Sequence, residues 1–237
     1  MCELLGMSFN KPAPPGFFLD TFWKHSKVHS DGWGLAFYQD KAAQVIKEPI
    51  KALSSGLASY LATYSAMRSN LFLAHIRHSS GTAHIYKNTH PFHRELEGKD
   101  YVFAHNGILK DYSFSFASTK PIGETDSESA FCYLLGKISK RKINKWSKND
   151  FQWLLAELKK VNSYGIFNCL FSDGEYLFCY RGRPDRRQKK PDRDLNYLRY
   201  TNGVIVATKS LTKGTWIPFL HGQLMIFKSG KVVFSTY

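Results

Sequence analysis

Short apolar runs, separated by turn residues, are the main feature of the chain. Runs of four to eight apolar, β-branched and aromatic residues bounded by Gly, Pro, Asn or Asp are typical of buried β-strands. This pattern predicts strands at 2–8, 35–38, 43–46, 71–77, 101–105, 166–171, 176–180, 203–208, 224–227 and 231–234. Ser172-Asp173-Gly174-Glu175 predicts a hairpin between two of them.

A few segments instead space their apolar residues at helical intervals, and these predict helices at 17–25, 54–67, 125–138 and 150–161. Ser54 or Ser55 is a suitable N-cap for the second helix. Thr125 and Asp126 precede the apolar run of the third, and acidic residues near a helix N-terminus suit the helix dipole. Strands towards both ends with helices between them predict an α+β protein of layered sheets with helices outside.

No repeat, low-complexity tract or interdomain linker interrupts the 237 residues, so we expect one domain over 1–237. We also expect a soluble, cytoplasmic protein. No apolar run approaches the length of a membrane span, and Asp20 and Lys24 interrupt the apolar character near the N-terminus. The four cysteines show no CxxC spacing, and in a cytosolic protein they need not form disulfides. Cys169 and Cys179 are expected to stay reduced in the core.

The formal net charge is +14, and most of the excess lies in two segments, 137–148 and 181–193. Such clustering raises the possibility of a nucleic-acid-binding protein. Trp146 is the only aromatic residue of the first segment and the second has none, so base stacking has little support. A solvated helix end and a basic loop are the favoured interpretations, and we expect no nucleic-acid partner.

Cys2 directly follows the initiator methionine. After removal of Met1, which we expect, one residue carries both a thiol and a free α-amine. An amine with a pKa of about 8 beside a thiol with a pKa of about 8.5 combines a base and a nucleophile. The simpler interpretation is a small apolar residue that begins a buried strand, and position alone favours it.

Three further groups lie at the ends of predicted elements: Arg77 closes 71–76, Asn106-Gly107 closes 101–105, and Asp126 opens a helix. Each has an ordinary explanation, and Asn-Gly by itself is more often a type I′ turn. With Cys2 they describe a pocket for an amino acid with a side-chain amide. Asn106 and Gly107 could bind an oxyanion, while Arg77 and Asp126 could bind the α-carboxylate and the α-ammonium.

Six motifs occur in an order that strongly resembles the class II glutamine amidotransferases, members of the N-terminal nucleophile hydrolase superfamily. They are Met1-Cys2-Glu3-Leu4-Leu5-Gly6, Asp31-Gly32-Trp33-Gly34-Leu35-Ala36, Ala74-His75-Ile76-Arg77, Asn88-Thr89-His90-Pro91-Phe92, Phe103-Ala104-His105-Asn106-Gly107 and Glu124-Thr125-Asp126-Ser127-Glu128. The resemblance covers most of 2–135. It implies a four-layer αββα sandwich of antiparallel sheets covered by helices, with glutamine as the ammonia source.

The resemblance also implies roles for individual residues: Cys2 as the catalytic nucleophile, Asn106 and Gly107 as the oxyanion hole, and Arg77 and Asp126 as glutamine clamps. Family synthases usually have tryptophan after the arginine and histidine four residues beyond it, whereas this chain has His78 and Gly81. His78 therefore becomes a candidate substrate-binding residue. The departure also leaves open whether the protein acts on glutamine alone. Family synthases also carry a second domain that binds the ammonia acceptor. This chain most resembles the branch of the family whose members have the glutamine amidotransferase domain alone, and some members of that branch resemble γ-glutamyl hydrolases.

Five histidines at positions 75, 78, 84, 90 and 93 invite a metal-site interpretation. The spacing of His75 and His78 on a strand end directs their rings to opposite faces, and no cysteine pair or acidic cluster joins them. We therefore expect no metal and no cofactor.

The favoured function is an amidohydrolase that acts on glutamine or a γ-glutamyl compound, with a separate synthase subunit as a possible partner. A weakly catalytic or silent partner subunit is the alternative, besides the nucleic-acid-binding protein.

Overall fold

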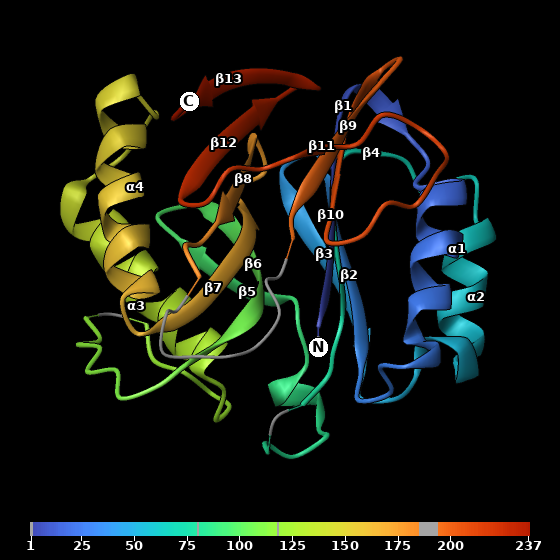
Figure 1. Cartoon of the computed structure of the whole chain (residues 1–237), viewed down its shortest axis with the longest axis horizontal. Helices are drawn as coiled ribbons and strands as arrows, with labels where there is room; N and C mark the ends of the chain where they lie inside the picture. The colour runs from blue at the N-terminus through green and yellow to red at the C-terminus, as the bar shows by residue number, and fades with distance from the viewer. Residues whose placement is uncertain (1, 80, 118, 185–193) are drawn as a thin grey trace.

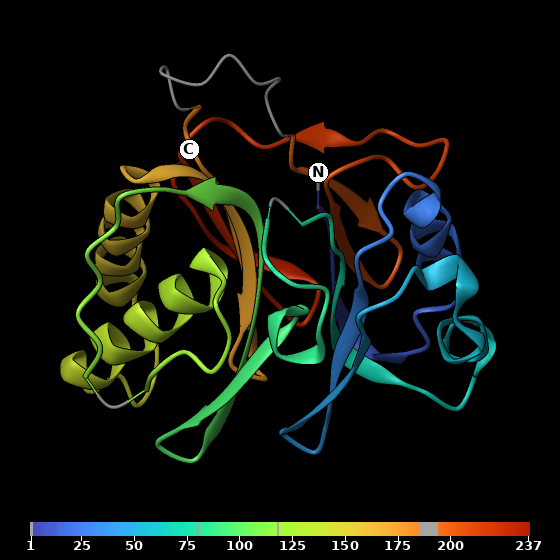
Figure 2. The ribbon, with the colours of Figure 1, turned by 90° about the horizontal axis from the view of Figure 1, so that it is seen from below.

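Two antiparallel β-sheets pack face to face, and a pair of helices covers the outer face of each (Figures 1 and 2). The computed structural model describes residues 2–79, 81–117, 119–184 and 194–237. Helices α1 (Gly16–Lys24) and α2 (Gly56–Thr63) lie on the first sheet, and α3 (Asp126–Arg141) and α4 (Lys148–Asn162) lie on the second. The predicted αββα sandwich is confirmed.

The first sheet has the strand order β11-β9-β10-β1-β4-β2-β3, and the second has β13-β12-β8-β7-β6-β5. The first contains β11 (Ile217–Pro218), β9 (Asn196–Tyr200), β10 (Gly203–Ala207), β1 (Glu3–Ala13), β4 (Ser69–Ile76), β2 (Trp33–Gln39) and β3 (Ala42–Glu48). The second contains β13 (Lys231–Ser235), β12 (Gln223–Lys228), β8 (Tyr176–Arg181), β7 (Gly165–Ser172), β6 (Lys99–Leu109) and β5 (Phe92–Leu96). Short 3₁₀ turns lie at His25–Lys27, Ala52–Ser54 and Tyr86–Asn88.

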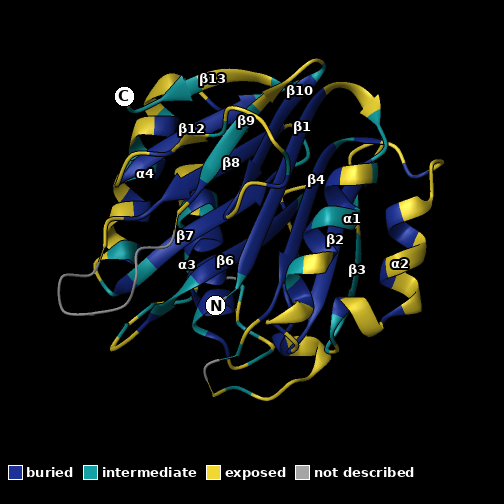
Figure 3. Ribbon diagram, turned by 45° about the vertical axis from the view of Figure 1, so that its right-hand side comes forward, coloured by how far each residue is buried: buried dark blue, intermediate teal, exposed yellow. Residues whose placement is uncertain are grey.

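Alternation of side chains along each strand divides the apolar residues among three core layers. Most of the strand residues in the interior of the two sheets are buried (Figure 3). In β1, Leu5 and Met7 pack with the residues of α1 and α2, whereas Leu4 faces the second sheet. Strands that are buried on both faces need continuous apolar runs, because neither face meets water. This is why the interior strands were recognisable in the sequence.

Side-chain caps determine where three helices begin. Ser55 Oγ accepts the Ala58 N–H at 2.9 Å, and Thr125 Oγ1 accepts the Glu128 N–H at 3.1 Å. Ser147 and Asp150 form a reciprocal capping box at the start of α4. These contacts satisfy N–H groups that have no partner within the helix. The second helix ends at Thr63, earlier than the predicted 67.

Two predicted strand ends are wrong. The strand of β6 continues through Asn106 and Gly107 to Leu109, where we expected a stop, because β7 pairs with it along that whole length. The strand of β1 likewise continues to Ala13, past residue 8, where we expected it to end. Strands β5, β9 and β11 were not predicted at all; β9 and β11 lie at the edge of the first sheet, where much of their surface is exposed.

Cys132, Cys169 and Cys179 are buried free thiols in the structure. Cys169 packs with the residues under α3 and α4, whereas Cys179 packs between the sheets. The two therefore lie on opposite faces of one sheet, in the core, as expected. Among the described residues, no helix is both long and apolar enough to cross a membrane.

Candidate active site

At one end of the space between the sheets, polar residues replace apolar ones. Leu71 and Leu73 of β4 pack in the inter-sheet core, and the same alternation directs His75 and Arg77 into that space. Along β6, Val102 and Ala104 are followed on the same face by Asn106. Cys2 precedes inter-sheet Leu4 by two residues. One end of the sandwich therefore contains Cys2, Arg77 and Asn106, although Cys2 and Asn106 are 104 positions apart in the sequence.

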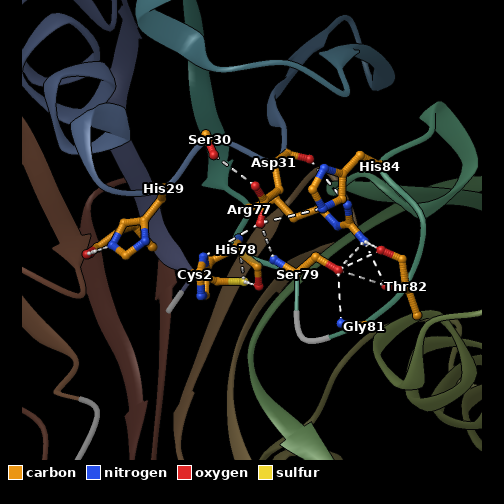
Figure 4. Close-up of polar contacts among 11 residues, drawn as sticks. Cys2, His29, Ser30, Asp31, Arg77, His78, Ser79, Gly81, Thr82 and His84 are labelled. Carbon is orange, nitrogen blue, oxygen red and sulfur yellow. Dashed lines mark hydrogen bonds and ion pairs between the residues drawn. The ribbon is translucent and has the colours of Figure 1, made fainter.

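The Cys2 thiol lies against the backbone of His78 (Figure 4). Its Sγ accepts the His78 N–H at 3.3 Å and lies 3.5 Å from the His78 carbonyl oxygen. The neighbouring residue Glu3 pairs with Ile76, so the ladder between β1 and β4 sets this position. Cys2 is half-buried. The sulfur is therefore held at the end of a strand rather than enclosed in the core.

Arg77 is buried, and loop residues hold its guanidinium (Figure 4). Nη1 donates to the Asp31 carbonyl oxygen at 3.2 Å, and Nη2 donates to Thr82 Oγ1 at 2.7 Å and to Ser79 Oγ at 3.3 Å. Burial lowers the pKa of Arg77, although the charges of Cys2 and Asp31 oppose this. A carboxylate that binds this guanidinium side-on would compete with Thr82.

Asp31 organises this loop, and the sequence analysis gave it no role. Its Oδ2 accepts the Ser79 N–H at 2.7 Å and lies 3.6 Å from His78 Nδ1 and 3.8 Å from His84 Nε2. The Ser79 N–H and the two imidazoles help to hold the pKa of Asp31 below its usual value, against the effect of burial. The sequence contained a signal for this role, because Asp31-Gly32 directly precedes β2, the strand that pairs with β4.

Asn106 and Gly107 lie within β6, opposite Asn168 and Phe167 of β7. The Lys110 N–H donates to the Tyr164 carbonyl oxygen, on the β7 side of β6. Successive backbone N–H groups of an antiparallel strand point to alternate edges, so the Gly107 N–H, three residues earlier, points to the edge of β6 away from β7. Strand β5 covers that edge only from Lys99 to Phe103. The Asn106 side chain and the Gly107 N–H can therefore both address a ligand at the end of the sandwich.

Asp126 is the first residue of α3 and lies on this same edge of β6. Its Oδ2 accepts the Leu109 N–H at 2.7 Å, and its Oδ1 accepts the Ser127 N–H at 2.8 Å. These donors are neutral, so they orient the carboxylate without cancelling its charge. A half-buried carboxylate held in this way suits an ammonium group.

His78, the sixth predicted site residue, contributes its backbone to the Cys2 contact, and its side chain is about half exposed. The ring faces His29, with 5.5 Å between the ring centroids, and Asp31. The structure therefore gathers Cys2, Arg77 and His78 in one cluster and places Asn106, Gly107 and Asp126 along the facing edge of the second sheet.

Behind this cluster, buried histidines support the two sheets. His75 Nε2 donates to the His105 carbonyl oxygen at 3.1 Å, and the His75 and His90 rings stack with 4.1 Å between centroids. The His90 nitrogens and His75 Nδ1 have no hydrogen-bond partner. Burial lowers the pKa of His75 to about 3 and the pKa of His90 well below its usual value.

This stack predicts that acid destabilises the fold. Below about pH 6.5 the unfolded chain binds protons at His75 and His90 that the folded chain excludes, so the free energy of unfolding falls as pH is lowered towards the folded pKa values. The loss approaches about 1.4 kcal/mol per pH unit for each histidine. Urea unfolding at several pH values measures it, and His90→Phe should flatten the dependence by about one proton. Equal pH dependence in wild type and His90→Phe would contradict this assignment.

Among the described residues, no group of three or more His, Cys, Asp or Glu side chains could hold a metal ion. The basic segment 137–148 covers the end of α3 and the start of α4, where Arg141 pairs with Asp150 and lies over the Trp153 ring. This agrees with a solvated helix end. Most of the second basic segment, 185–193, lies outside the described residues.

Comparison with known proteins identifies the family. The family model for class-II glutamine amidotransferases matches residues 1–237. The Escherichia coli protein named "Putative glutamine amidotransferase YafJ" is 34% identical over 98% of this chain and its own full length. An uncharacterized protein of Methanocaldococcus jannaschii is 44% identical over the whole chain, which spans 72% of that relative.

Solved structures agree with this assignment. A crystal structure from Pseudomonas aeruginosa, described as a predicted glutamine amidotransferase, superposes with a TM-score of 0.71 at 26% identity and covers 98% of this chain and 100% of its own. Glutamine phosphoribosylpyrophosphate amidotransferase from Bacillus subtilis shares the fold, with a TM-score of 0.66 at 15% identity, and this chain covers 48% of it. The chain therefore belongs to the class II glutamine amidotransferases.

Proposed function

We propose that this protein is an amidohydrolase that cleaves the side-chain amide of glutamine or of a γ-glutamyl compound through a thioester on Cys2. One observation carries the proposal: Cys2, Arg77 and Asn106 face the same end of the inter-sheet space, and Asp126 lies on the β6 edge that the Gly107 N–H addresses. A nucleophile, an oxyanion site and two opposite charges are the groups that an amino acid with a side-chain amide requires. Residues 1–237 act as one domain.

The reaction begins after removal of Met1, when the α-amine of Cys2 takes the thiol proton. The thiolate sulfur bonds to the amide carbon, and the Asn106 side chain and the Gly107 N–H stabilise the oxyanion. The protonated α-amine gives its proton to the leaving nitrogen as the C–N bond breaks, which leaves a γ-glutamyl thioester. Water attacks the thioester by the same route, releasing glutamate and restoring the thiol.

The wall of the site supports a substrate range wider than free glutamine. His78, about half exposed beside Cys2, occupies the position where family synthases usually have tryptophan. An open wall can admit a leaving amine larger than ammonia, so γ-glutamyl amides are candidate substrates. Ammonia could also pass to a separate synthase subunit. No step of this chemistry requires a cofactor, a membrane or nucleic acid, and we place the reaction in the cytoplasm.

Purified protein incubated with glutamine and a set of γ-glutamyl amides tests the proposal. We expect glutamate release, covalent labelling of Cys2 by a glutamine-like diazoketone, and an N-terminus at Cys2 by mass spectrometry. A retained Met1 in fully active protein would refute the amine as the base. Absence of both turnover and labelling, together with a stable complex with a synthase, would favour the silent-subunit alternative.

Replacement of Arg77 by lysine is expected to raise KM by about 10- to 100-fold with a smaller change in kcat, because lysine cannot form the paired hydrogen bonds of a guanidinium with a carboxylate. Steady-state kinetics on glutamine measures the change. Arg68, an exposed arginine whose Nη2 donates to the Pro12 carbonyl oxygen, offers a matched control, and Arg68→Lys should leave KM unchanged. An unchanged KM in Arg77→Lys would remove the carboxylate-clamp assignment.

A further inference from the structure

A cavity of about 440 Å³ lies between the edge strands β3 and β5 of the two sheets. Its walls come from β3 of the first sheet, β5 of the second, the loop before β5 and the start of α3. Within the first sheet, β2 separates β3 from β4, so β3 lies about 10 Å from the strand that leads to Arg77. Its volume is within the range of small-molecule sites.

Lys47 lines this cavity at a position where the strand pattern calls for an apolar residue. Ala43 and Val45 precede it on the same face of β3 and pack against the inter-sheet core. The Lys47 ammonium donates to the Thr89 carbonyl oxygen at 2.6 Å and to the Pro91 carbonyl oxygen at 3.2 Å. An ammonium has three N–H donors, so these two bonds leave one for a ligand.

The cations of this cavity differ in how their charges are balanced. Arg94 pairs with buried Glu128, and Lys87 pairs with Glu124 at 2.8 Å. Among the residues that the structure describes, Lys47 contacts carbonyl oxygens and aromatic rings but no carboxylate. Burial accordingly lowers the pKa of Lys47 to about 8, although Glu128 counteracts part of the shift. The ammonium therefore stays mostly protonated near neutral pH, and no carboxylate of the described residues forms an ion pair with it.

The remaining walls favour an apolar body on the ligand. Lys47 Nζ lies 4.8 Å from the centroid of the Tyr86 ring and 5.3 Å from that of Phe92, and both rings line the cavity. Ile122 adds an exposed apolar side chain at its surface. Glu128 also lines the cavity, and its charge opposes a ligand with two negative charges.

We infer that this cavity is a binding site for a small organic monocarboxylate, whose carboxylate pairs with Lys47 and whose apolar body lies against Tyr86 and Phe92. The site is separate from the Cys2 cluster and needs no part of the amide chemistry. It also adjoins the loop that carries His90, because Lys47 bonds to the residues on either side of that histidine.

Calorimetric titration of the full chain with benzoate, benzamide and inorganic phosphate tests the site. Benzoate should bind with a dissociation constant between micromolar and millimolar, while neutral benzamide and phosphate should bind about tenfold more weakly or not at all. Lys47→Met should weaken benzoate binding by about 10- to 100-fold. Lys24→Met is the matched control, since that exposed lysine of α1 pairs with Asp20 and does not line the cavity, and it should bind benzoate as wild type does.

Because Lys47→Met also removes bonds to the loop, a second variant separates binding from folding. Ile122 is 69% exposed, so Ile122→Asp adds a negative charge at the cavity without disturbing the core, and it too should weaken benzoate binding. Equal binding of benzoate and benzamide, no binding of benzoate by wild type, or undiminished binding by both Lys47→Met and Ile122→Asp would each overturn the inference. These readouts do not depend on hydrolytic activity.

Discussion

Replacing Cys2 with alanine is expected to lower the rate of glutamate release by about 10⁴-fold or more, because no other atom of the site can form the thioester. The fold should persist, since Cys2 precedes the first paired residue of β1 and is only half-buried. Single-turnover assays with glutamine, together with thermal unfolding, measure both effects. Glutamine binding should survive, because Arg77 and Asp126 remain.

A matched Cys2→Ser variant separates nucleophilicity from shape. A serine hydroxyl occupies nearly the same space and leaves the α-amine in place, but a hydroxyl is far harder to deprotonate than a thiol. Cys2→Ser should therefore bind substrate and turn over much more slowly than wild type. Turnover at the wild-type rate in Cys2→Ala would remove the proposed mechanism.

Replacing Gly107 with alanine is expected to damage both stability and activity. A Cβ atom there would lie 1.8 Å from the Ile166 carbonyl oxygen and 2.2 Å from His105 Nε2. The first is backbone, so β6 and β7 must separate locally, and the Gly107 N–H moves with them. We expect a loss of about 3 kcal/mol or more in the free energy of unfolding, measured by urea denaturation, with little residual turnover.

Two variants show whether this effect is specific to Gly107. Gly136 lies within α3, where an added Cβ atom would be 3.5 Å from Ala117, an ordinary contact. Gly136→Ala should be neutral or stabilising by up to about 1 kcal/mol. Asn106→Ala should remain folded but lose about 100- to 1,000-fold in rate, as expected for one oxyanion donor. Wild-type activity in both Gly107→Ala and Asn106→Ala would contradict the oxyanion assignment.

The C-terminal end of β6 shows where a prediction from the local sequence pattern was wrong. Asn106-Gly107 is a frequent hairpin turn, and the strand was expected to stop there. The chain instead continues through Ile108 and Leu109, because Gly165 and Ile166 of β7 pair with them. A partner more than fifty residues away decides this conformation, and local propensity cannot include it. The small size of Gly107 serves the close approach of Ile166 rather than a turn.

Strands β5, β9 and β11 were the ones that the sequence did not predict. Strand β9 is half exposed along its length, so its residues carry little of the continuous apolar signal of the interior strands. Its place follows from pairing with β10 on one side and with β11 on the other. The role of Asp31 was missed for a related reason. Its contacts with Ser79, His78 and His84 join segments that are about fifty residues apart in the chain.

Short-range patterns in the sequence were enough to predict most of the strands, the helices and the family motifs, and to single out the Cys2 thiol next to Met1, because burial periodicity and motif spacing are short-range properties. Only the packed sheets decided that Cys2, Arg77 and Asn106 share one end of the sandwich and that Asp126 lies on the edge addressed by the Gly107 N–H. The packing also decided that Lys47, within the described part of the chain, bonds to carbonyl oxygens rather than to a carboxylate. Those relations depend on strand register and on two sheets closing over one another, and both arise from contacts between residues far apart in sequence.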